Sequence, residues 1–197
     1  MNKLLLIIVA ASFIFFLNKN KFSHYQAAGP FLAPKQVVLE IPKKLMAPPS
    51  FQIMATHSYE LTAMIMSKSR YWLDGPSKLS PVDFVLAWGP LTKKNYLSKI
   101  NYSQWGRWYY FNYRESEDFM INEEDITSNS ANTHIIPDFS KPFLKKQILN
   151  FKEGQVVRLI GYLVTVTREG ETLWESSTVR TDTGAGACEV FYVTGAY

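Results

Sequence analysis

The sequence predicts an α+β protein: a curled antiparallel sheet, or a small OB- or SH3-like barrel, with a few short helices packed on it. Three observations support this class. The aromatic share is 15%, and aromatic side chains suit a pleated sheet surface. In the last third of the chain, a long strand candidate is followed by a tight turn and a return strand. Gly161 interrupts the long strand, where glycine marks a bend or a close backbone approach.

The first 21 residues form either a signal anchor or a signal peptide. An uncharged apolar run from Leu4 to Leu17 lies between Lys3 and Lys19. As a helix it would span about 21 Å, short of the roughly 30 Å hydrocarbon core of a bilayer. This length suits a short anchor as well as a signal peptide, and the poor cleavage signals favour the uncleaved anchor. No cysteine follows the run, which excludes lipoprotein processing.

Both alternatives carry the rest of the chain across a membrane. We expect a single-pass inner-membrane protein with its domain in the periplasm; the alternative is release into the periplasm after cleavage. Residues 22–50 contain five prolines and predict a tether or arm with one short strand at 36–41. A single α+β globular domain is expected over residues 51–197.

The first half of that domain is predicted to contain two strands and a helix. The stretch "SYELTAMIMS", residues 58–67, alternates as a strand does. In "LSPVDFVLAWG", residues 79–89, Ser80 suits a helix N-cap, a proline follows it, and Asp83 suits the third helical position. This interpretation gives Asp83 a capping role and no catalytic one. "GRWYYFNYR", residues 106–114, is an aromatic strand expected near the centre of the sheet.

The second half is predicted to begin with helices and to end in a sheet. Residues 93–100 form a further helical turn, and residues 122–137 form an acidic helix that runs into a polar loop and a short β-like triplet. Residues 140–150 form an amphipathic helix with Phe143 among its inward-facing side chains. The remaining residues, 151–197, form turns and strands that end in "CEVFYV".

Charge argues against a nucleic-acid partner. The formal net charge is +4, from 21 basic and 17 acidic residues. Three lysines and no acidic residue stand in the first 21 positions, so 21 − 3 = 18 basic residues face 17 acidic ones in the remainder. Nucleic-acid-binding domains carry a clustered basic face, and this nearly neutral domain lacks one.

The single cysteine, Cys188, stands between a glycine-rich turn and an apolar run in "RTDTGAGACEV". A nucleophilic thiol needs exposure and a group that lowers its pKa, such as an imidazole or a helix N-terminus. A strand-like run follows Cys188, so no helix supplies that effect. His134 could supply it, with Asn132 or Asp182 as the orienting partner. Free cysteines are among the most buried residues, and we favour a packed structural thiol, with catalysis as the alternative.

His134 and two arginines complete the candidate residues. His134 lies in the polar stretch "SNSANTHIIP", which could line a site or simply cap a loop. Three dispersed histidines and one cysteine give no ligand spacing, so we expect no metal and, without a cofactor fingerprint, no cofactor. Arg180 is expected to pair with Asp182 or Glu189, and Arg107 to meet a carboxylate or an aromatic ring. The catalytic candidates are His134, Cys188 and Asp182; the binding candidates are Arg107, Asn132, Arg180 and Glu189.

Four stretches together resemble a family of uncharacterised Gram-negative envelope proteins: "LSPVDFVLAWG", "SNSANTHIIP", "GQVVRLIGYLV" and "SSTVRTDTGAGACEVFYV". Members of that family pair a short N-terminal apolar segment with a domain that ends in a similar Asp-Thr-Gly…Ala-Cys-Glu block. The resemblance covers roughly residues 29–197, and Thr133 replaces the methionine expected there. The family has no established activity, so the resemblance supports the domain limits and the location and implies no catalytic residue.

The sequence alone favours a membrane-tethered, periplasm-facing binding or assembly module of the bacterial envelope, held by its N-terminal segment and acting on an envelope protein partner. The alternative is an envelope hydrolase with a site around His134 and Cys188. The two hypotheses differ in one structural expectation. A hydrolase requires an accessible Cys188 thiol beside the His134 imidazole, whereas a binding module leaves the thiol packed.

Overall fold

The computed structural model describes residues 31–113 and 120–197. The predicted anchor or signal segment, residues 1–21, and the first part of the predicted tether, residues 22–30, lie outside them. In the described residues, no helix has the length and apolar character that a membrane crossing requires. The strands are β1 (Lys35–Leu45), β2 (Phe51–Arg70), β3 (Val82–Ala87), β4 (Ile100–Trp105), β5 (Trp108–Tyr113), β6 (Ser130–Pro137), β7 (Val156–Arg168), β8 (Glu171–Glu175) and β9 (Glu189–Ala196). The helices are η1 (Gly75–Lys78), η2 (Gly89–Thr92), α2 (Lys94–Leu97), α3 (Glu123–Ser128) and α4 (Pro142–Asn150).

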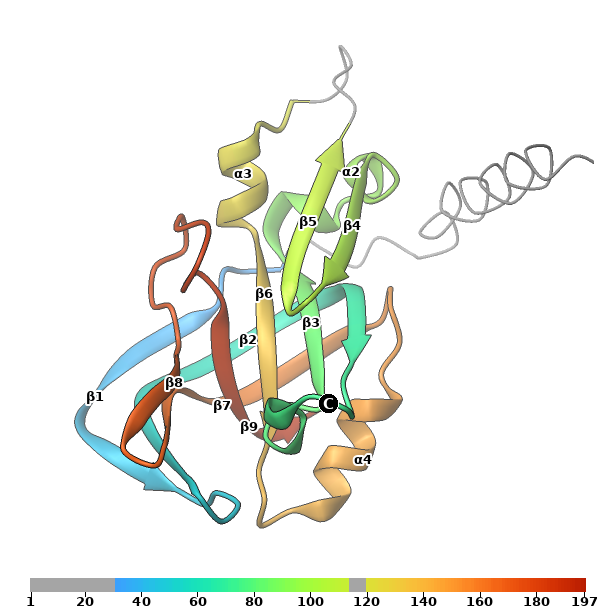
Figure 1. Cartoon of the computed structure of the whole chain (residues 1–197). Coiled ribbons are helices and arrows are strands. Elements are labelled where there is room, and N and C mark those ends of the chain that lie inside the picture. The colour runs from blue at the N-terminus through green and yellow to red at the C-terminus, as the bar shows by residue number, and fades with distance from the viewer. Residues whose placement is uncertain (1–30, 114–119) are drawn as a thin grey trace, which may run out of the picture.

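One sheet dominates the molecule and curls until it closes (Figure 1). Its strands follow the order β1-β2-β3-β6-β9-β7-β8, and β2 also pairs with β7. The strands β2, β3, β6, β9 and β7 therefore form a ring. Neighbours in the ring are antiparallel, apart from the parallel pair of β6 and β9. The predicted α+β class with a curled, mainly antiparallel sheet is confirmed.

The main hydrophobic core fills the ring. Successive side chains of a strand point to opposite faces of a sheet, so every second residue of each ring strand points inward. α4 covers the end of the ring opposite α3 (Figure 1) and adds two buried side chains to this core. The inward set includes Leu61, Phe84, Ile135, Leu144, Ile148, Leu159 and Phe191.

Gly161 permits the close packing of β7 against β9. A Cβ atom at this position would lie 1.9 Å from the carbonyl oxygen of Tyr192, a distance that no side chain tolerates. The pairing of β7 with β9 also shifts register beside Gly161. The predicted close backbone approach at this glycine is confirmed.

Two smaller apolar clusters lie on the outside of the ring. The β4–β5 hairpin and α3 pack over the outer face of β3, and β1 and β8 bound the second cluster. β5 pairs only with β4, so the prediction that residues 106–114 form a central strand is wrong. The hairpin instead turns at Gly106 and Arg107, which both have positive φ, as a two-residue hairpin turn requires.

The helix predicted over residues 79–89 is also wrong. That stretch contains β3, and all of its residues from Val82 to Ala87 are buried. A strand covered on both faces loses its polar alternation, and the short run after Ser80 and Pro81 therefore resembles the start of a helix.

The stretch expected to be a polar loop after the acidic helix is β6, whose residues are all buried. The predicted helix over 140–150 is confirmed as α4, although Phe143 is 67% exposed and points away from the core. The strand candidate at 36–41 is confirmed and is longer, as β1, which pairs with β2 along the edge of the sheet.

Candidate functional site

The register of the sheet brings Asp83 and His134 together. They are direct partners in the antiparallel ladder of β3 and β6, so their side chains emerge on the same face. His134 Nδ1 lies 2.9 Å from Asp83 Oδ2, although the two atoms are not aligned as a linear hydrogen bond. Asp83 is 0% exposed. The residue assigned to a helix cap is therefore a buried charge beside an imidazole.

The parallel pairing of β6 with β9 brings the Cys188 thiol to the same place as the Asp83–His134 pair. Thr133 is the register partner of Glu189, so Cys188 comes level with Asn132. Asn132 Nδ2 donates to Cys188 Sγ at 3.4 Å, and the thiol is also a hydrogen-bonding neighbour of the His134 imidazole.

The thiol is not packed away as the sequence favoured. Cys188 is half-buried and lines a pocket. Its backbone explains this position, because Cys188 precedes β9 and leaves the glycine-rich turn, in which Gly184 and Gly186 both have positive φ. Cys188 is therefore less buried than expected and lies beside His134, as the alternative required.

The imidazole of His134 is held in its charged form. Burial alone would lower its pKa, but the contacts with Asp83 and then Cys188, together with their charges, raise the pKa of His134 to about 9. The ring also stacks on Trp174 of β8, with centroids 5.0 Å apart and an interplanar angle of 20°. A proton therefore stays on this imidazole at neutral pH.

Arg107 fixes Asp83 from the hairpin. Its Nη1 donates to Asp83 Oδ1 at 3.1 Å, and the Ser80 hydroxyl donates to the same oxygen at 3.2 Å. The guanidinium also pairs with Asp74 and lies 3.9 Å from the ring centre of Tyr71. The expected carboxylate and ring partners of Arg107 are both found.

Asn132 connects this network to the hairpin backbone. Its Nδ2 donates to the carbonyl oxygen of Arg107 at 2.8 Å, and its Oδ1 accepts from Gln104 Nε2 at 2.8 Å. Because Asn132 also contacts the thiol, the hairpin turn and Cys188 are held in one hydrogen-bonded arrangement. Asn132 therefore positions the hairpin turn and Cys188, and both polar atoms of its side-chain amide have hydrogen-bond partners.

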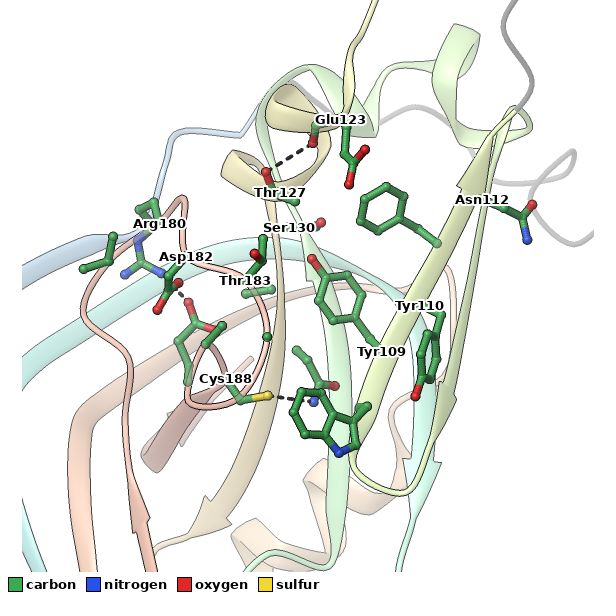
Figure 2. A pocket seen from close by; sticks show the side chains of 18 of the residues that line it. Tyr109, Tyr110, Asn112, Glu123, Thr127, Ser130, Arg180, Asp182, Thr183 and Cys188 are labelled. Atoms are coloured by element: carbon green, nitrogen blue, oxygen red, sulfur yellow. Dashed lines mark hydrogen bonds and ion pairs between the residues drawn. The ribbon is translucent and has the colours of Figure 1, made fainter.

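A pocket of about 460 Å³ opens beside the thiol. β5 forms one wall, α3 the second, and the chain between β8 and β9 the third (Figure 2). The wall from β5 is aromatic, whereas the opposite wall carries charged and polar side chains. The lining includes Trp108, Tyr109, Tyr110, Glu123, Arg180, Asp182, Cys188 and Glu189.

Arg180 and Glu189 form a second buried pair. Arg180 Nη1 donates to Glu189 Oε1 and to the hydroxyl of Tyr59, and Nη2 donates to Gln36 Oε1. Glu189 is 2% exposed, and its Oε2 has no partner in hydrogen-bonding geometry among the described residues. Burial raises the pKa of Glu189 to about 7, against the opposing effects of Arg180 and its own backbone amide. The predicted ion pair of Arg180 with Glu189 is confirmed.

Asp182 does not orient His134. Its carboxylate accepts a hydrogen bond of 2.6 Å from the Ser177 hydroxyl, and Asp83 takes the orienting place instead. The sequence contained a signal for Asp83: one charge within the apolar run "VDFVLA". A charge in such a run is buried if the run is a strand, and a buried charge requires a partner.

Comparisons with models of protein families, with curated proteins and with solved structures find no match to this chain. In the part of the chain that the structure describes, no cluster of three or more His, Cys, Asp or Glu side chains could hold a metal ion. The chemistry of the site must therefore be argued from its own geometry.

Proposed function

We propose that this protein is a thiol-dependent acyl-transfer enzyme of the bacterial envelope, in its simplest form a hydrolase. Cys188 is the nucleophile, His134 the acid and base, and Asp83 the group that orients His134. The observation that carries this proposal is the order of three side chains, Cys188 directly before β9, His134 on β6 and Asp83 on β3, beside a pocket. A nucleophile, a base and an orienting carboxylate in this order are the parts that acyl transfer requires.

Two half-reactions follow. In the first, the Cys188 thiolate, paired with the imidazolium of His134, attacks the carbonyl carbon of an ester or amide, and a C–S bond forms. The bond to the leaving group breaks, and the imidazolium of His134 gives its proton to the departing oxygen or nitrogen. In the second, water attacks the thioester, His134 accepts a proton from it, and the acid and the thiolate separate. Asp83 stabilises the imidazolium throughout.

We also propose that the closed ring is an OB-like barrel. Its five strands in chain order, β2, β3, β6, β7 and β9, follow the ring order first, second, third, fifth, fourth. A single helix, α4, stands between the third and the fourth of them. In OB barrels the second and third strands and the adjoining loops bind the ligand, and Asp83 and His134 lie on those two strands.

The proposed location is the periplasmic side of the inner membrane, with residues 1–21 as the anchor. This part of the proposal is supported by the apolar run and by the resemblance to envelope proteins, both from sequence. Its partner would then be an acyl-bearing component of the envelope.

The test uses the single thiol. p-Nitrophenyl butanoate is added to the protein, and intact-mass spectrometry after an acid quench measures the butanoyl adduct. Because the chain has one cysteine, peptide mapping of that adduct is unambiguous. We expect acylation of Cys188 at least about 100-fold faster than acylation of the free peptide RTDTGAGACEV, since general acid–base assistance contributes that much.

Cys188→Ala should give no adduct, and His134→Gln should react at the rate of the peptide. A wild-type rate equal to the peptide rate would overturn the enzymatic proposal. The pocket would then support the other hypothesis, a binding module of the envelope with a positioned but unreactive thiol.

A further inference from the structure

The pocket beside the thiol is acidic. Three of its lining side chains are carboxylates, Glu123, Asp182 and Glu189, and one is a cation, Arg180, so their formal sum is −3 + 1 = −2. The whole chain, in contrast, has a formal charge of +4. Charges that line one concave surface concentrate their potential there, and this surface favours a positively charged occupant.

One of those carboxylates is incompletely satisfied. Glu189 is buried and lines the pocket, and its Oε2 has no partner in hydrogen-bonding geometry within the described chain. A buried acceptor without a partner destabilises the folded protein. Arg180 is engaged with the other oxygen, with Tyr59 and with Gln36. A donor from a ligand would complete the coordination of Glu189.

The facing wall suits a cation as well. β5 lines the pocket with aromatic side chains, and Tyr109 points toward the side of the pocket that carries Arg180 and Asp182 (Figure 2). The face of an aromatic ring attracts an ammonium group, and the attraction is stronger where water is excluded. Carboxylates on one side and aromatic rings on the other form the usual surroundings of a bound organic ammonium ion.

We propose that this pocket recognises a protonated primary amine on the acyl substrate, with Glu189 Oε2 as its principal acceptor. This inference rests on the proposed function and names its substrate class: an acyl donor that carries an ammonium group. Glu189 directly follows Cys188 in the chain, so the amine site and the nucleophile share one pocket.

The test compares three esters that differ in one group. The p-nitrophenyl esters of β-alanine, butanoic acid and succinic acid present an ammonium, a methyl and a carboxylate group on an equivalent acyl chain. We expect the second-order rate of Cys188 acylation to be at least tenfold higher for the β-alanyl ester than for the butanoyl ester, and lowest for the succinyl ester. Each rate is divided by that of the free peptide to remove the intrinsic reactivity of the ester.

Variants show which carboxylate causes the preference for the β-alanyl ester. Glu189→Gln should reduce the ratio of β-alanyl to butanoyl rates to about one. If this variant does not fold, a pair of variants in α3 tests the same site. Glu123→Gln lines the pocket and should reduce the ratio two- to threefold, whereas Glu124→Gln, its neighbour in the same first turn of α3, lies outside the lining and should not.

A binding measurement separates failure of this inference from failure of the proposed function. Butylammonium chloride is titrated into Cys188→Ala by calorimetry, in two buffers of different ionisation enthalpy. Binding with release of a proton near pH 7, lost in Glu189→Gln, supports the amine site even if no ester acylates the wild type. Equal acylation by the three esters, or no butylammonium binding with an active thiol, would overturn the amine site and leave the enzyme proposal standing.

Discussion

Two arginine–carboxylate pairs, Arg107–Asp83 and Arg180–Glu189, lie on either side of the thiol. Their carboxylates differ in how many of their oxygens have a basic partner. Each oxygen of Asp83 lies beside a basic side chain: Arg107 and Ser80 donate to Oδ1, and His134 Nδ1 lies 2.9 Å from Oδ2, without the alignment of a hydrogen bond. In the second pair, Arg180 engages only Oε1 of Glu189. The first carboxylate therefore has a basic partner at each oxygen, whereas among the described residues the second has one at Oε1 alone.

The difference indicates two different roles. A carboxylate whose oxygens are all held cannot reorient, which suits the fixing of a catalytic imidazole. A carboxylate with one free oxygen on a pocket wall retains the capacity to bind. That oxygen, without a partner, lowers the stability of the folded protein, as residues of functional sites commonly do.

The largest expected effect is on acylation. Asp83→Asn should reduce the rate of Cys188 acylation by p-nitrophenyl butanoate about 10³- to 10⁴-fold, because loss of the orienting carboxylate leaves the imidazole in the wrong protonation state. Glu189→Gln should change this rate by less than about tenfold, since the neutral ester uses no contact with Glu189. The rates are measured by intact-mass spectrometry. Equal losses in the two variants would contradict the division of roles.

The next effect is on stability. Arg107→Met should lower the free energy of unfolding by about 3 kcal/mol, because it removes a partner from a carboxylate that has no contact with water. Arg180→Met should cost about 1–2 kcal/mol, since Glu189, with its pKa of about 7, takes up a proton when the guanidinium is absent. Urea unfolding at pH 7 measures both, and a larger loss for Arg180→Met would reverse the comparison.

The third effect is the pH dependence of stability. The folded pKa of His134, about 9, lies above its ordinary value of 6.5, so its contribution is complete below pH 6.5 and is lost as the pH rises through 9. Linkage makes this loss on the order of 3 kcal/mol. Asp83→Asn should remove most of the decline in this window, as followed by urea unfolding across the pH range.

Glu189 affects the stability of the protein at a lower pH than His134 does. Its folded pKa of about 7 lies above the ordinary 4.5, so stability declines as the pH rises from 4.5 through 7 and the buried carboxyl ionises. Glu189→Gln should flatten the curve there and leave the decline near pH 9 unchanged. If one variant flattened both windows, the two pairs would not be independent.

Much of the fold could be predicted from the sequence where the pattern was local. The strand at 58–67, the helix at 140–150 and the close approach at Gly161 each followed from side-chain period or backbone chemistry, and the structure bears them out. The ring itself could not be predicted, because its closure depends on pairing between β2 and β7, which are far apart in the chain.

The site was harder for a related reason. His134 and Cys188 were candidates by residue type, but Asp83 was assigned to a helix because "SPVD" satisfies capping rules and "VDFVLA" lacks strand alternation. Both errors arise from burial on two faces, which a single sequence does not reveal. The strand β6 carried a weaker signal that was missed: Ser130, Asn132 and His134 alternate with Ala131, Thr133 and Ile135, and this period of two predicts one polar face.

The smallest expected effect comes from an exposed pair that serves as the reference for the other two. Arg158 Nη2 lies 2.6 Å from Glu60 Oε1, but the side chains are 54% and 39% exposed. Exposed pairs contribute about 0–1 kcal/mol and weaken with salt, so Arg158→Gln should lower the free energy of unfolding by less than about 1 kcal/mol in low salt and by still less in 1 M NaCl. This distance is shorter than the 3.1 Å between Arg107 Nη1 and Asp83 Oδ1 and close to the 2.5 Å between Arg180 Nη1 and Glu189 Oε1, so distance alone would rank the exposed pair with the buried ones. If Arg158→Gln cost as much as Arg107→Met, exclusion of water would not be what separates the pairs, and the distinct roles assigned to Asp83 and Glu189 would lose their physical basis.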